Sequence, residues 1–215
     1  MRAVPKWTLV PSGCAPVVLV AGWTTAGALE GPSYDAVRQT ISVLAAYGAR
    51  GFWVMTGALL ALGVCHLGTA WGLRAAAPAG RAALAAGGVA ALAVAMVPTP
   101  SSGGALRHGS VVAVGFTLLA LWPVLAARPG DRPAPWALRR APAYAATLLM
   151  GAGALWFLVE ANRQGAAGVA ERLVTCVQSL WPLVVVVSCL RHQHVARRGR
   201  GPGERHVEGS GRAAR

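Results

Sequence analysis

Six long apolar runs constrain the fold of this chain more than any other feature of its sequence. Each run is 17 to 22 residues long, which at about 1.5 Å per helical residue matches a hydrocarbon core of about 30 Å. Only 13% of the residues are charged, whereas a soluble domain carries about 25%. The sequence therefore predicts an all-α membrane protein with six transmembrane helices. The predicted spans cover about residues 11–29, 52–73, 81–97, 108–127, 141–159 and 172–190.

The segment between the first two spans has a different pattern. Pro32 followed by Ser33 predicts a helix start with Ser33 as its N-cap, and Gly48 predicts its end. One face of this segment is apolar and carries Tyr34, Val37, Ile41 and Leu44; the other is polar and carries Asp35, Arg38, Gln39 and Ser42. We expect a short amphipathic helix over about 34–47, lying at one membrane surface.

The distribution of Lys and Arg predicts the orientation. The N-terminus, the loops at 74–81 and 128–140 and the tail at 191–215 hold fifteen of these residues, and the alternate loops hold five. Cytoplasmic loops are enriched in Lys and Arg, so we expect both termini in the cytoplasm and the 34–47 helix outside. Residues 1–190 would form a single bundle, and the tail would be disordered. A cleaved signal peptide ending near Ala26-Gly27-Ala28 is the alternative, and it would leave five spans.

The net charge of +13 does not indicate a nucleic-acid partner, because the Lys and Arg residues flank the apolar runs or lie in the tail. The partner that the sequence does indicate is the lipid bilayer, with a lipid or small molecule on the outer side as a candidate ligand; it identifies no particular protein partner. We expect no metal and no cofactor. His192 and His194 have no carboxylate or thiolate arranged near them, the four cysteines form no CxxC pair, and nucleotide-binding motifs are absent.

The polar residues expected on the outer side form a candidate site. The candidate binding residues are Tyr34, Asp35, Arg38, Gln39, Ser42, Arg107, His108, Glu171 and Arg172. Asp35, Ser42 and His108 are weak candidates for catalysis, since a serine beside a histidine is a nucleophile beside a base. The alternative is that helix ends at a membrane surface are polar in any case, with Asp35–Arg38 and Glu171–Arg172 as local ion pairs.

Three functions remain open on these residues. The first is non-enzymatic binding of a lipid headgroup, small solute or partner protein at the outer face. The second is hydrolysis or group transfer on a membrane lipid, which requires Ser42 or Asp35 within about 2.6–3.2 Å of His108. The third is transport of a small solute past His66 and Gln178, the polar residues expected inside spans. An interhelical hydrogen bond is the alternative role for both.

The stretch Tyr34-Asp35-Ala36-Val37-Arg38-Gln39-Thr40-Ile41-Ser42 resembles the signature of a bacterial membrane family, domain of unknown function 998. Three weaker features follow in the same order: Trp53-Val54-Met55-Thr56, the turn from Pro98 to His108, and Gly168-Val169-Ala170-Glu171-Arg172. The resemblance covers about residues 12–190. It implies an uncharacterised six-span protein of the bacterial cytoplasmic membrane and brings no activity with it.

Overall fold

The computed structural model describes residues 3–99, 106–128 and 134–198. Six of its helices are long and apolar enough to cross a membrane, which agrees with the six predicted spans. They are α1 (Leu9–Glu30), α3 (Phe52–Gly72), α4 (Pro78–Met96), α5 (Leu106–Ala126), α6 (Arg140–Arg163) and α7 (Ala167–Arg198). A four-residue helix, α2 (Ile41–Leu44), follows α1, and short 3-10 turns lie at Lys6–Thr8, Gly31–Ser33 and Trp136–Leu138. The protein is an all-α integral membrane protein.

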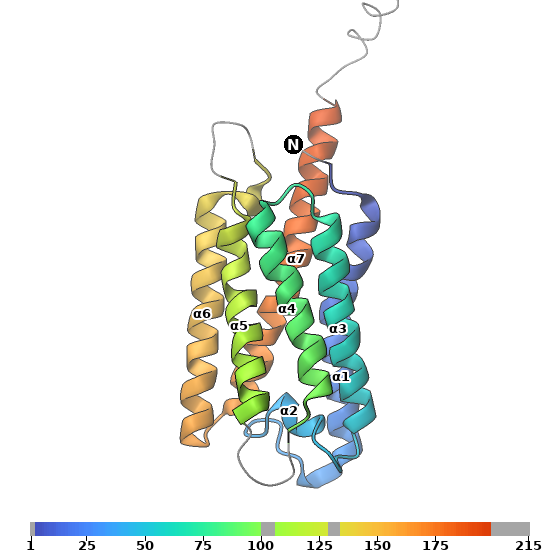
Figure 1. The fold of residues 1–215 in the computed structure, drawn as a ribbon, viewed down its shortest axis with the longest axis vertical. Helices are drawn as coiled ribbons and strands as arrows, with labels where there is room; N and C mark the ends of the chain where they lie inside the picture. The colour runs from blue at the N-terminus through green and yellow to red at the C-terminus, as the bar shows by residue number, and fades with distance from the viewer. Residues whose placement is uncertain (1–2, 100–105, 129–133, 199–215) are drawn as a thin grey trace, which may run out of the picture.

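The six long helices form a closed ring in chain order. Each packs against the next long helix in the sequence, and α7 closes the ring by packing against α1 as well as α6. Figure 1 shows α2 at one end of this bundle, where the chain passes from α1 to α3 and from α6 to α7. We call this the α2 end. The N-terminal residues and the last turns of α7 lie at the opposite end.

Two clusters of buried side chains fill the bundle, one toward each end. The cluster at the opposite end surrounds Trp122, which is fully buried between Leu84, Leu138 and Val186. The cluster at the α2 end includes Ile41 and Leu44, both buried against α1 and α3. The short α2 helix is therefore part of the packed core and does not lie flat on a membrane surface.

The predicted helix over 34–47 is present only at Ile41–Leu44. Ser33 is not its N-cap but ends a 3-10 turn, and the backbone at Thr40 is extended. Side chains form hydrogen bonds with the backbone N–H and C=O groups that a longer helix would use for its own hydrogen bonds. The Asp35 carboxylate accepts from the backbone N–H of Val37, and Arg172 binds backbone carbonyls of the segment.

The other boundary that differs is the start of the tail. Residues 191–198, predicted to be disordered, continue α7 as a helix to Arg198. An apolar span can extend into a basic helical segment because arginine is a good helix former and its charge suits a helix C-terminus. The rest of the predicted tail, residues 199–215, lies outside the described residues.

Candidate functional site

Ser42 and His108 meet at the α2 end, although 66 positions separate them. His108 lies in the first turn of α5 with only 6% of its surface exposed. Its Nε2 is 3.0 Å from the Ser42 hydroxyl oxygen, and its Nδ1 is 2.8 Å from the carbonyl oxygen of Val97. A carbonyl can only accept, so Nδ1 carries the proton and, in the neutral ring, Nε2 accepts from Ser42. The Ser42–His108 distance lies within the range that the catalytic hypothesis requires.

A buried carboxylate on α7 positions the residue before Ser42. The Glu171 side chain is only 4% exposed and accepts a hydrogen bond from the backbone N–H of Ile41. Because Ile41 and Leu44 are also buried, the first turn of α2 is held both by packing and by this bond. Ser42 is thereby fixed between α5 and α7.

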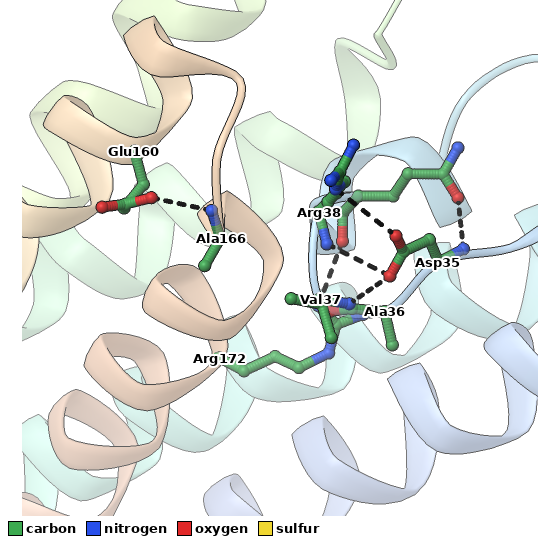
Figure 2. A network of polar contacts seen from close by, with 8 residues as sticks. Asp35, Ala36, Val37, Arg38, Glu160, Ala166 and Arg172 are labelled. Carbon is green, nitrogen blue, oxygen red and sulfur yellow. Dashed lines mark hydrogen bonds and ion pairs between the residues drawn. The ribbon is translucent and has the colours of Figure 1, made fainter.

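Arg172 holds the loop of residues 34–39, which precedes α2, against α7 through hydrogen bonds. Its Nη1 donates to the carbonyl oxygens of Ala36, Gln39 and Gly168 at 3.0, 3.1 and 2.8 Å. Its Nη2 donates to the Tyr34 hydroxyl, and the guanidinium carbon lies 5.8 Å from the centre of the Tyr34 ring. Burial raises the pKa of the Tyr34 phenol although Arg172 acts to lower it, so Tyr34 stays neutral. Figure 2 shows the Arg172 side chain reaching toward this loop.

Asp35 and Arg38 face outward and do not join the Ser42–His108 pair. Asp35 accepts from the backbone N–H groups of Val37 and Arg38, as Figure 2 shows. Its carboxylate lies 3.9 Å from Arg38 Nε, and the two side chains are 52% and 74% exposed respectively. The predicted Asp35–Arg38 ion pair is confirmed. The hypothesis that Asp35 belongs to a catalytic cluster with Ser42 is not supported, because the Asp35 carboxylate accepts hydrogen bonds from nearby backbone N–H groups and so stabilises a local turn.

The remaining outer candidates also have local or structural partners. Gln39 accepts from the backbone N–H of Asp35, and Arg107 is exposed. Glu171 and Arg172 do not form the predicted ion pair, since one binds Ile41 and the other binds the loop carbonyls. Glu160 accepts from the backbone N–H of Ala166 and so stabilises the turn into α7 (Figure 2).

A groove between α5 and α6 leads away from the Ser42–His108 pair. Its volume is about 500 Å³. The polar part of its wall consists of Thr40, Ser42, Thr99, His108 and Thr117, and the apolar part includes Phe116, Leu155, Phe157 and Leu158. The Thr99 hydroxyl is buried and has no hydrogen-bond partner among the described residues. The groove can take a long apolar group with a polar end next to His108.

The two polar residues expected inside spans have different surroundings. Gln178 Nε2 donates to the carbonyl oxygen of Phe116 at 3.1 Å, which is an interhelical hydrogen bond between α7 and α5. His66 is 1% exposed, and neither of its ring nitrogens has a partner within the described part of the chain. Gln178 borders an interior cavity whose lining does not include His66. The two residues therefore do not mark a shared polar path.

Sequence reasoning missed two parts of this site. The Val97 carbonyl orients His108, but a backbone acceptor carries no signal in the sequence. The groove is lined by Phe116, Leu155 and similar residues, which any lipid-facing helix contains. The signal that did suggest Ser42 and His108 was the position of His108 at a helix start, at the membrane level of Ser42. No three His, Cys, Asp or Glu side chains of the described residues are close enough to hold a metal ion.

Comparison with known proteins agrees with the resemblance seen in the sequence. The family model described as "Protein of unknown function (DUF998)" matches residues 14–188. No curated protein and no solved structure matches the chain.

Proposed function

The chain belongs to the DUF998 family of proteins of unknown function, and from its site we propose that it binds a membrane lipid at the α2 end. The polar part of the lipid contacts Ser42 and His108, and an acyl chain occupies the groove between α5 and α6. The observation that carries this proposal is the groove of about 500 Å³ with a buried histidine at its polar end.

A lipid suits this groove better than a soluble ligand does. Its apolar wall belongs to two membrane-spanning helices, so an acyl chain already present in the bilayer can enter from the side. Ligand sites combine an apolar lining with a few polar groups that fix orientation, and His108 with the Thr99 hydroxyl supplies those groups. The positive-inside count supports the outer leaflet as the source of the lipid.

The test fills the groove and measures the lipid that copurifies with the protein. Leu155→Trp places a large ring in the groove, so lipid recovered by mass spectrometry after detergent purification should fall several-fold. Leu148→Trp is the matched control, because Leu148 lies two helical turns away on α6, is similarly exposed and does not line the groove. Equal lipid content in wild type and Leu155→Trp, with both folded, would contradict the proposal.

Acyl transfer from a lipid ester is the second candidate, and the 3.0 Å distance between Ser42 and His108 favours it. In this reaction the Ser42 oxygen attacks the ester carbonyl carbon while His108 Nε2 takes the hydroxyl proton. The same proton then passes to the departing alcohol, and an acyl-serine remains for attack by water or a second alcohol. The Val97 carbonyl supports this role, because it keeps the proton on Nδ1.

A serine-reactive fluorophosphonate distinguishes the two candidates. If Ser42 is a nucleophile, the wild type is labelled, Ser42→Ala is not, and His108→Ala reacts at least about tenfold more slowly, since a positioned base contributes about 10²–10⁴-fold. Ser110→Ala is the control, because Ser110 is exposed in the same helix turn as His108 and its hydroxyl donates to Leu106. Unlabelled wild type would exclude the enzyme and leave lipid binding unaffected.

A further inference from the structure

A second cavity lies inside the helix ring beneath α2, next to the proposed lipid groove, with which it shares Ser42, Val112 and Phe116. Its volume is about 90 Å³, several times the space that a single water needs. Most of its wall is apolar and comes from α1, α3, α4 and α5, with residues such as Leu19, Leu62 and Leu119. A cavity of this composition can hold a small molecule that is mainly hydrocarbon.

The polar groups of this cavity occupy one part of its wall. Glu171, Thr175 and Gln178 follow one another at four- and three-residue spacing on α7, and Ser42 lies beside Glu171. The hydrogen-bond donors of these side chains are largely bonded to other groups of the protein. The Thr175 hydroxyl donates to the Glu171 carbonyl, and Gln178 donates to the Phe116 carbonyl. The groups left for a ligand are mainly acceptors, so the ligand should be a hydrogen-bond donor.

Glu171 adds a charge requirement to this hydrogen-bond pattern. Glu171 is only 4% exposed in a spanning helix, and its carboxylate accepts from the Ile41 N–H, a neutral donor; an ionised group in this place is costly unless an opposite charge pairs with it. Its neighbour Arg172 directs its guanidinium to the loop carbonyls and Tyr34, and no Lys or Arg of the described residues lines the cavity. A ligand with a cationic end would supply the missing charge.

We infer that the central cavity is a binding site for a small alkylammonium ion. The ammonium group pairs with Glu171 and donates to the Thr175 and Gln178 oxygens, and the alkyl chain packs against the leucines of α1, α3 and α5. This site goes beyond the proposed lipid groove: the two share α5 and Ser42, but the cavity is otherwise lined by α1, α3, α4 and α7 instead of α6, and by a carboxylate in place of a histidine.

The experiment measures hexylammonium binding to the purified protein in detergent at pH 8, where an alkylamine, like a lysine, is protonated. 1-Hexanol is the uncharged analogue of the same length, and hexanoate is the anionic one. Wild type should bind hexylammonium about ten- to a hundredfold more tightly than hexanol, as expected for a hydrogen bond to a charged group. It should bind hexanoate more weakly than either.

Glu171→Gln tests the role of the carboxylate. Glutamine keeps an acceptor for the Ile41 N–H, so the fold should survive, while hexylammonium should lose its advantage over hexanol. Glu160→Gln is the matched control, because Glu160 also lies at the α2 end but binds Ala166 outside the cavity. That variant should bind hexylammonium as the wild type does.

Leu119→Trp fills the cavity without changing any charge and should abolish binding of both hexylammonium and hexanol. It also serves as the test if Glu171→Gln fails to fold. Leu155→Trp in the lipid groove should leave hexylammonium binding unchanged, so the failure of either proposal can be recognised separately. Equal binding of hexylammonium to wild type and to folded Glu171→Gln, or to wild type and Leu119→Trp, would overturn the inference.

Discussion

At the scale of single residues, Arg172 shows how one side chain can organise a loop. Its guanidinium donates to carbonyl oxygens of Ala36 and Gln39, two positions in a segment that lies more than 130 residues earlier in the chain. Five N–H donors in a rigid fork allow one arginine to satisfy several acceptors, which a lysine ammonium does less well. The loop that leads to Ser42 therefore depends on a residue of α7.

Replacing Arg172 by alanine should loosen the 34–39 loop without unfolding the bundle. Hydrogen bonds to a charged group contribute about 1.5–3 kcal/mol, so amide hydrogen exchange in this loop should accelerate by about ten- to a hundredfold. Arg38→Ala is the control: its ion pair with Asp35 is exposed, and such pairs contribute about 0–1 kcal/mol. Similar exchange rates in the two variants would show that Arg172 does not hold the loop.

At the scale of helices, close packing depends on small residues where two backbones approach. Gly63 of α3 faces Gly88 of α4, and Gly80 of α4 faces the backbone of Ala126 in α5. Apolar lipid gives no hydrophobic drive for helix association, so membrane helices associate through such van der Waals contacts. The alanine- and glycine-rich composition of α4 suits its place between α3 and α5.

Gly80→Ala should destabilise the bundle, because a Cβ at this position would overlap the Ala126 backbone. Overpacking typically costs about 1–3 kcal/mol, which would lower the thermal midpoint measured in detergent. Gly57→Ala is the matched control in α3, since a Cβ there meets nothing within 4 Å. Alanine is the better helix former by about 1 kcal/mol, so this variant should be as stable as wild type or more stable. A Gly80→Ala midpoint at or above that of Gly57→Ala would refute the packing argument.

At the scale of the whole molecule, the two ends of the bundle differ in charge. Among the described residues, the opposite end holds nine Lys and Arg residues, and the α2 end holds five. The ring closes because α7 returns from the α2 end and packs between α6 and α1. Because the site proposed for lipid binding lies at the α2 end, it faces one side of the membrane only.

We expect the α2 end to lie outside the cytoplasm, and cysteine labelling tests this orientation. In a variant without the four native cysteines, Ser33→Cys should react with a membrane-impermeant maleimide in intact cells. Arg140→Cys, exposed at the opposite end, should react only after the membrane is permeabilised. The reverse pattern would mean that the orientation predicted from the Lys and Arg distribution is wrong and that the lipid comes from the inner leaflet.

Features that depend on neighbours in the chain were predictable. The six spans follow from the length and hydropathy of each segment, and Asp35 reaches Arg38 because they are three residues apart. Gln178 could be assigned an interhelical bond, because a polar amide inside a span needs a partner. Each of these could be inferred from one segment alone, although the partner of Gln178 could not be named in advance.

The pairing of distant polar groups depended instead on how the helices are arranged around the ring. Hydropathy gives the level of Ser42, His108 and Glu171 in the membrane, but not the rotation or order of the helices that carry them. The fold brings Ser42 to His108, and it brings Glu171 to the peptide N–H of Ile41, 130 positions away. Those long-range contacts occupy backbone groups of residues 36–41, and they reduce the helix predicted over 34–47 to the four residues of α2. The amphipathic pattern of residues 34–47 gives no sign of these competing hydrogen bonds, because the side chains that form them come from another part of the chain.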